Sequence, residues 1–128
     1  MAKKVLICGQ DPDTVDFTDP AIPPGMNAAK VRAGIAACVT TLTEAGYDVG
    51  QCYTDAGETA EAVVTALLRD TAYDCVMIGA GIRMPPSKLF LFEKLLNAVH
   101  RHAPQAAICF NTRPDDSVEA VRRWLPLP

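Results

Sequence analysis

Long hydrophobic runs and an excess of basic residues are both missing from this sequence of 128 residues. No apolar run approaches the roughly 20 residues that cross a bilayer. The apolar stretch Val5–Cys8 is also too short for the core of a signal peptide. Lys and Arg number 12 against 15 Asp and Glu, which gives a net charge of −3 rather than the basic surplus typical of nucleic-acid binding. We therefore expect a cytoplasmic protein that binds neither membrane nor nucleic acid.

Residues that usually carry cofactor or metal chemistry are sparse. Aromatic residues make up only 6% of the chain, which disfavours a flavin. His100 and His102 both fall in the last turn of a predicted helix, where the helix dipole favours their charged form, and we interpret them as structural. The cysteines lie too far apart in sequence for a Cys-x-x-Cys motif and are expected to be buried free thiols, with Cys8 set apart at a strand end: Cys8, Cys38, Cys52, Cys75 and Cys109. We predict no cofactor, no metal ion and no recognisable catalytic constellation, and leave enzymatic activity open.

What is present is a regular alternation of two hydrophobic periods. Short apolar runs typical of strands buried on both faces alternate with segments of helical period. The predicted strands are 4–8, 47–53, 73–78 and 106–110, and the predicted helices are 27–45, 57–72, 87–102 and 116–125. This βαβαβαβα order predicts one α/β domain over residues 1–128. We expect a flavodoxin-like, doubly wound parallel sheet with strand order 2-1-3-4 and helices on both faces.

Several residues mark helix ends. Asn27 is a suitable N-cap, and Gly46 stands where a glycine commonly follows a helix. Ser87 is predicted to cap the third helix. Asp116 with Glu119 resembles a capping box at the start of the fourth.

Residues 10–26 form a loop much longer than the two to six residues usual between a strand and a helix. The loop is acidic and contains four prolines, which lower the entropy cost of ordering it. Val15, Phe17 and Ile22 could hold it against the domain. We therefore predict an ordered flap over the end of the first strand.

Polar residues and glycines follow the apolar interior of each predicted strand. In open parallel sheets, ligands bind outside the carboxyl ends of the strands, where the strand order reverses. Polar strand ends are also ordinary loop composition, so a purely structural role stays open. The candidate ligand-binding residues at this edge are Gln10, Asp11, Asp13, Asp55, Gly79, Gly81, Arg83, Asn111, Thr112 and Arg113.

The chemistry of these candidates favours an anion. Arg83 and Arg113 could face one wall of the crevice, because a guanidinium binds carboxylate or phosphate through two hydrogen bonds. Gly79 and Gly81 could expose backbone N–H groups to the same anion, or form a tight turn that needs positive φ. The full dinucleotide-binding pattern is absent after this strand. As alternatives, Arg83 pairs with aspartates of residues 10–26, or Asp11 and Asp55 hold Mg²⁺.

Two segments carry a resemblance to a known family. Ala45-Gly46-Tyr47-Asp48-Val49, and Tyr73 to Ile78 followed by Ile82-Arg83-Met84-Pro85, resemble the receiver domains of bacterial response regulators. The resemblance implies a phosphoacceptor aspartate at the position of Gly81, so phosphotransfer is not carried over. It also matches the family's strand-4 hydroxyl to Thr112 and its acidic pair to Asp11 and Asp13, while the family's fifth strand has no counterpart. Ile78 to Arg83 with Cys109 to Thr112 also looks like a small bacterial family that has no assigned activity.

Two hypotheses of function follow. The first is a receiver-like or flavodoxin-like module without catalytic activity that binds another protein or itself. A homodimer is expected because a four-stranded sheet has two free edges and because Trp124, Leu125 and Leu127 cluster near the last helix. The second is a domain that binds a small molecule or anion at the crevice covered by residues 10–26, with enzymatic activity left open.

Overall fold

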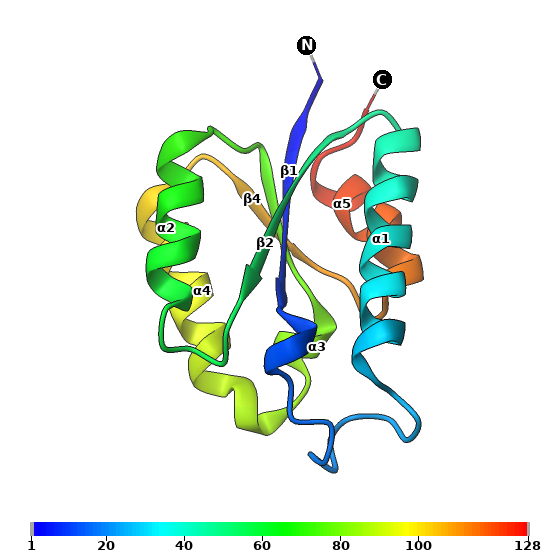
Figure 1. The fold of residues 1–128 in the computed structure, drawn as a ribbon. Helices are drawn as coiled ribbons and strands as arrows, with labels where there is room; N and C mark the ends of the chain where they lie inside the picture. The colour runs from blue at the N-terminus through cyan, green and yellow to red at the C-terminus, as the bar shows by residue number, and fades with distance from the viewer. Residues whose placement is uncertain (1, 128) are drawn as a thin grey trace.

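The computed structural model describes residues 2–127, in which strands and helices alternate along the chain (Figure 1). The strands are β1 (Lys4–Gln10), β2 (Asp48–Thr54), β3 (Cys75–Ile78) and β4 (Ala107–Phe110). The α-helices are α1 (Ala28–Glu44), α2 (Ala60–Asp70), α3 (Ala80–Arg83), α4 (Leu89–His102) and α5 (Ser117–Trp124). Short 3₁₀ helices, η1 (Pro12–Thr14), η2 (Pro86–Lys88) and η3 (Pro114–Asp116), lie in loops that follow β1, β3 and β4.

The four strands form one parallel sheet in the order β2-β1-β3-β4, which confirms the predicted topology. β1 and β3 are central, and residues such as Val5, Leu6 and Val76 are fully buried because helices cover them from both sides. β1 runs two residues further than predicted: Gly9 does not stop it, since Gly9 and Gln10 pair with Tyr53 and Thr54 of β2. This extension carries Gln10 to the carboxyl end of the sheet.

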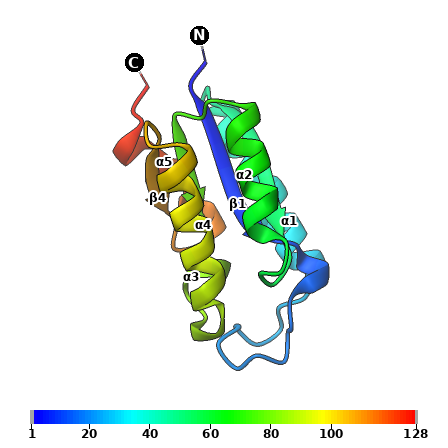
Figure 2. The ribbon, with the colours of Figure 1, turned by 90° about the vertical axis from the view of Figure 1, so that its left-hand side faces the viewer.

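Helices cover both faces of the sheet, as predicted for a flavodoxin-like arrangement (Figures 1 and 2). Leu6 and Cys8 point to one core, which contains side chains of α2, α3 and α4. Val5 and Ile7 point to the other core, against α1 and α5. This division follows from the two-residue period of a strand, which sends alternate side chains to opposite faces.

Gly50 lies inside β2, at the point where the sequence predicts a weakened strand. A side chain there would collide with the ring of Tyr73, which packs over the Gly50 backbone. The absence of a side chain at Gly50 therefore leaves room for the Tyr73 ring, and the strand continues through this residue.

The helix ends confirm two of the four predicted caps. The Asn27 Oδ1 accepts a hydrogen bond from Lys30 N (2.9 Å), and Gly46 follows α1 with a φ of +105°. Ser87 does not cap α4; it lies within η2, and α4 begins at Leu89. The Asp116 side chain accepts from the backbone N–H groups of Thr112 and Arg113 rather than from its own helix, so the capping box with Glu119 was wrong.

The segment after β3 differs from the sequence prediction. Gly79 ends the strand with a φ of −69° and directly precedes the four-residue helix α3. Neither Gly79 nor Gly81 has positive φ, so the tight turn predicted there is absent. The prediction failed because a single helical turn is too short to show a hydrophobic period.

Residues 11–27 run from β1 to α1 along the carboxyl ends of the strands (Figure 2). Short turns build this segment, which we call the flap: Asp11, Asp16 and Asp19 each accept a hydrogen bond from a backbone N–H two residues later. The Ser87 hydroxyl donates to Asp19 Oδ2 (2.6 Å), which ties the flap to η2. The predicted anchors Val15, Phe17 and Ile22 are half-buried.

Candidate functional site

The structure divides the ten predicted site residues into two groups at the carboxyl-end edge of the sheet. One group follows β1 and β2 and contains Gln10, Asp11, Asp13 and Asp55. The other follows β3 and β4 and contains Gly79, Gly81, Arg83, Asn111, Thr112 and Arg113.

Gln10 and Thr54 are the buried polar residues of the β1–β2 group, with 6% and 1% of their surface exposed. They are direct neighbours across the two strands. Gln10 Nε2 donates to the carbonyl and the hydroxyl of Thr14, both at 3.1 Å, which closes η1 over the end of β1. Within residues 2–127, Gln10 Oε1 and Thr54 Oγ1 have no hydrogen-bond partner. Sequence reasoning places Thr54 at this edge without selecting it, because a threonine in a strand carries no functional signal.

The aspartates of this group close loops. Asp11 Oδ1 accepts from Asp13 N (3.0 Å), and Asp13 forms an exposed ion pair with Arg32 of α1 (2.6 Å). Asp55 accepts from the N–H groups of Gly57 and Thr59 and from the Thr59 hydroxyl. These hydrogen bonds lower the pKa of Asp55 below its ordinary value, and the bond from the Thr59 hydroxyl has the largest effect. Asp11 and Asp55 thus have local partners of their own, and no group of three or more metal-ligating side chains lies together in the described chain.

Asn111 organises the β3–β4 group. It is 6% exposed. Its Oδ1 accepts from Ala80 N at the start of α3 (2.9 Å), and its Nδ2 donates to Ser117 Oγ at the start of α5 (3.0 Å). One amide side chain therefore joins the ends of β3 and β4 to two helices, with both of its ends in use.

Arg83 turns inward onto this group. Its Nη2 donates to the Asn111 carbonyl (2.7 Å), and its guanidinium carbon lies 5.1 Å from the centre of the Phe110 ring. The second nitrogen, Nη1, is shielded from solvent and has no hydrogen-bond partner among residues 2–127. No carboxylate of the described residues lies within ion-pair distance of Arg83, so the predicted pairing with flap aspartates is wrong. Asp13 pairs instead with Arg32.

Thr112 and Arg113 are exposed and engaged locally. The Thr112 hydroxyl and backbone N–H donate to the Asp116 carboxylate. Arg113 Nε pairs with Asp115 (2.6 Å) on the surface. Within residues 2–127 the two arginines share no hydrogen-bond or ion-pair partner.

The glycines after β3 do not form an anion cradle. Gly79 N donates to the Cys8 carbonyl (3.0 Å), which joins β3 to β1 and uses up that N–H. Gly81 is exposed on α3, and a Cβ added there would meet nothing within 4 Å. The expectation that both N–H groups lie open to a ligand therefore fails at Gly79.

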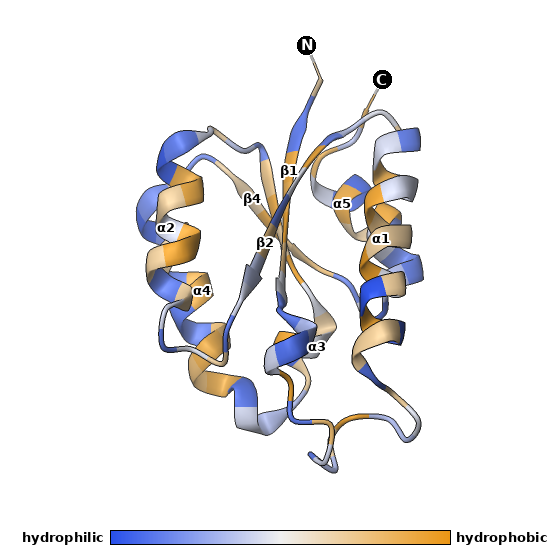
Figure 3. Cartoon of the chain, in the orientation of Figure 1, coloured by the Kyte–Doolittle hydropathy of each residue, from blue (hydrophilic) through white to orange (hydrophobic). Residues whose placement is uncertain are grey.

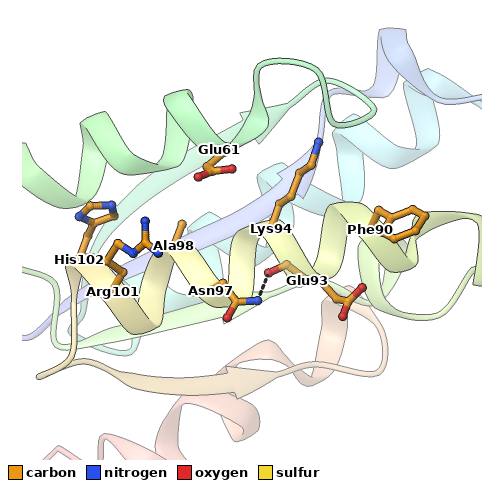
Figure 4. Close-up of a pocket in the computed structure, with 8 residues that line it drawn as sticks. All are labelled: Glu61, Phe90, Glu93, Lys94, Asn97, Ala98, Arg101 and His102. Carbon is orange, nitrogen blue, oxygen red and sulfur yellow. Dashed lines mark hydrogen bonds between the residues drawn. The ribbon is translucent and has the colours of Figure 1, made fainter.

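Surface hollows lie elsewhere, between α2 and α4. One of about 300 Å³ lies between Glu61 of α2 and Lys94 of α4, with Phe90 towards one end and His102 towards the other (Figure 4). A second, of about 600 Å³, shares Glu61 and His102 and extends towards Arg69. Neither contains any of the ten predicted residues, and both are shallow and lined by charges of both signs. As a place for a small ligand we give more weight to the strand ends, because buried polar groups without partners in residues 2–127 lie there.

No family model, curated protein or solved structure matches this chain. None of the helices in residues 2–127 has the length and apolar character needed to cross a membrane.

Proposed function

We propose that this chain is a receiver-like module without catalytic activity that binds a second copy of itself. The observation that carries the proposal is the exposure of Met84, Leu89 and Phe90, which are 67%, 57% and 77% exposed. They are three of the six large apolar side chains exposed in residues 2–127, and they fall within seven residues. Figure 3 shows the hydrophobic colour on the first turn of α4. Concentrated exposed apolar surface is typical of a protein–protein contact.

The charges around this apolar segment favour a copy of the chain as the partner. Lys88 lies inside the segment, and Glu93 and Lys94 follow on the next turn of α4. The charge of Lys88 helps to lower the pKa of the flap aspartates Asp16 and Asp19, after their hydrogen bonds with Thr18 and Ser87. A surface with both signs beside an apolar centre can pair with itself about a two-fold axis, positive group to negative group.

Gly81 supports the non-catalytic part of the proposal. The receiver resemblance implies a phosphoacceptor at this position, and here it is a surface glycine on α3. Asp11 and Asp13, which the resemblance matches to the family's acidic pair, are engaged with η1 and with Arg32.

Sedimentation velocity at micromolar concentration tests the dimer. We expect the wild type to sediment as a dimer and Phe90→Ser to sediment as a monomer. Trp124→Ser is the matched control, because Trp124 is 61% exposed but lies on α5, away from the segment. A wild-type mass near 13.7 kDa at all concentrations, or dissociation by Trp124→Ser alone, would refute the proposal.

A second function is favoured by one observation, the Arg83 guanidinium. It is a partly buried cation without a carboxylate partner in the described residues, and its Nη1 donates to nothing there. A buried cation gains most from an anion because the surroundings screen the charge poorly. Since Nη1 has no contact with solvent, an anion can reach it only after neighbouring side chains move.

Thermal shifts with phosphate, sulfate, citrate and nucleotides test this second function, with Mg²⁺ and Ca²⁺ as the opposing series. Binding predicts a melting temperature that rises with anion concentration, a rise lost in Arg83→Ala and kept in Arg113→Ala. Arg113 is the matched control because it is exposed and paired with Asp115. A rise with divalent cations only, or equal loss in both variants, would count against an anion at Arg83.

A further inference from the structure

Four of the five free cysteines form two pairs across neighbouring strands. Cys8 of β1 lies beside Cys52 of β2, and Cys75 of β3 lies beside Cys109 of β4. Every one of them is buried. The two pairs lie on opposite faces of the sheet, the first in the core with α2 and α4 and the second in the core with α1 and α5.

The backbone geometry differs between the pairs. Cys8 and Cys52 are direct partners in the parallel register. Neighbouring strands lie about 4.8 Å apart, which is inside the roughly 4.4–6.8 Å range of Cα separations that a disulfide spans. Both side chains point to the same core, so the two sulfurs lie on the same side of the sheet.

The second pair has its sulfurs in contact but its backbone too far apart. Cys75 Sγ and Cys109 Sγ are 3.5 Å apart. Cys75 pairs with Ala107, however, and Cys109 pairs with Met77, so the two cysteines are offset by two residues along the strands. Two residues of rise combined with the strand spacing place their Cα atoms about 8 Å apart, beyond the limit for a disulfide without backbone movement.

We propose that Cys8 and Cys52 form a reversible intramolecular disulfide on exposure to a peroxide, whereas Cys75 and Cys109 remain thiols. In the first step one sulfur attacks a peroxide oxygen and becomes a sulfenic acid, and water leaves. In the second step the other thiol attacks that sulfur, forms the S–S bond and releases a second water. Two thiol hydrogens and the two oxygens of hydrogen peroxide are thereby consumed, and the peroxide is reduced to two waters.

The local electrostatics differ between the two sulfurs. The hydrogen bond to Cys52 raises the pKa of Cys8, and burial raises it further. The same hydrogen bond lowers the pKa of Cys52. Because Cys52 lies on the edge strand β2 and Cys8 on the central strand β1, we assign the attack on the peroxide to Cys52 and the resolving step to Cys8. The directions of the two pKa shifts agree with this order, since the thiolate is the nucleophile.

Access to Cys52 comes through the edge of the sheet. β2 has only β1 as a neighbour, so its opening breaks a single ladder. Edge elements with one neighbour open locally more readily than the centre of a sheet. Cys109 lies on β4, the other edge strand, so access alone does not distinguish the two pairs. What prevents a Cys75–Cys109 disulfide is the separation of their Cα atoms.

Peptide mapping after peroxide treatment tests the proposal. In a Cys38→Ala background each remaining cysteine falls on its own tryptic peptide, with Cys8 in residues 5–30 and Cys52 in residues 33–69. We expect the folded protein to lose two hydrogen atoms in intact mass and to yield one linked product of these two peptides. Dithiothreitol should restore the original mass.

Single replacements supply the controls. Cys8→Ala and Cys52→Ala should abolish the linked product, and Cys75→Ala should leave it unchanged, with a thermal melt confirming that each variant is folded. A Cys75–Cys109 link, a disulfide between two chains, oxidation of Cys52 to sulfinic acid without a link, or linkage seen only in denaturant would each overturn the proposal. The Cys38→Ala protein keeps both cysteine pairs, so its peptide map shows directly which pair becomes linked. This result stands even if one of the single variants fails to fold.

Discussion

The two halves of the carboxyl-end edge use their polar residues in different ways. On the β1–β2 half, aspartates close turns, and the buried oxygens Gln10 Oε1 and Thr54 Oγ1 have no partner within residues 2–127. On the β3–β4 half, Asn111 uses both ends of its side chain, and the Arg83 cation has no counter-charge in that part of the chain. Buried oxygens without a hydrogen-bond partner in residues 2–127 therefore lie on one half of the edge, and a guanidinium N–H donor without one lies on the other.

The largest expected effect comes from breaking the strand that joins the halves. Ile78 ends β3 next to β1 and is fully buried. Ile78→Asp removes apolar burial and buries a charge, a loss of about 5 kcal/mol or more, which is comparable to the whole stability of a small domain. We expect an unfolded or insoluble protein by circular dichroism. Val63→Asp, at a more exposed site on α2, should melt near the wild type, and a cooperative wild-type melt for Ile78→Asp would contradict the strand assignment.

A direct comparison of Asn111→Ala with Gln10→Ala sharpens the contrast between the halves. Asn111→Ala leaves Ala80 N without its acceptor and Ser117 Oγ without its donor, and should cost about 2–3 kcal/mol. Gln10→Ala removes bonds to Thr14 but also an oxygen that has no partner in residues 2–127, and should cost about 1 kcal/mol. Urea unfolding measures both. Equal losses would mean that the two halves are held alike.

The two arginines provide a smaller test. Arg83→Ala removes the contact with Phe110 and the bond to the Asn111 carbonyl, and should cost about 1 kcal/mol. Arg113→Ala removes only a surface ion pair, and should change stability by less than about 0.5 kcal/mol. A larger loss at Arg113 in urea unfolding would show that the exposed arginine, and not the inward one, stabilises this half.

The smallest effect concerns the flap and its pH dependence. The Ser87 hydroxyl lowers the pKa of Asp19, so the carboxylate form is the one that is bound. A lowered pKa means that this contact is intact at neutral pH and is lost as pH falls below the ordinary value of 3.8. Ser87→Ala should speed proteolytic cleavage within the flap several-fold at pH 7, with the global melt unchanged. A cleavage rate equal to that of the wild type would show that the hydrogen bond between Ser87 and Asp19 does not hold the flap in place.

The fold could be read from the sequence because its determinants are local and periodic. Val5–Cys8 and Cys75–Ile78 are continuous apolar runs, and short runs of this kind are typical of strands covered from two sides. Asn27 and Gly46 act within a few residues of their own positions, so their roles could also be predicted. The alternation of strands with helices indicated a parallel sheet, and the order 2-1-3-4 was predicted by analogy with flavodoxin-like folds.

The site could be predicted only as a location. Asn111 binds Ala80, 31 residues away, and Ser87 binds Asp19, 68 residues away. Such partners depend on how loops from different strands meet, and no local pattern encodes them. For the same reason, the sequence could not show that Asp13 forms its ion pair with Arg32 and not with Arg83. The helix α3 was missed because four residues carry no period.

The position of β1 has a consequence for folding during synthesis. β1 is the first strand made, yet it lies inside the sheet, between β2 and β3. The β1–α1–β2 unit can pair as soon as Thr54 has been made, but the other side of β1 must wait for Cys75–Ile78. In that interval the edge of β1 that later pairs with β3 is unpaired, and apolar residues that the fold buries, such as Leu6 and Ile7, can associate with other chains. The nascent protein therefore depends on α2 and β3 following quickly, and slow elongation between residues 54 and 78 should increase its aggregation.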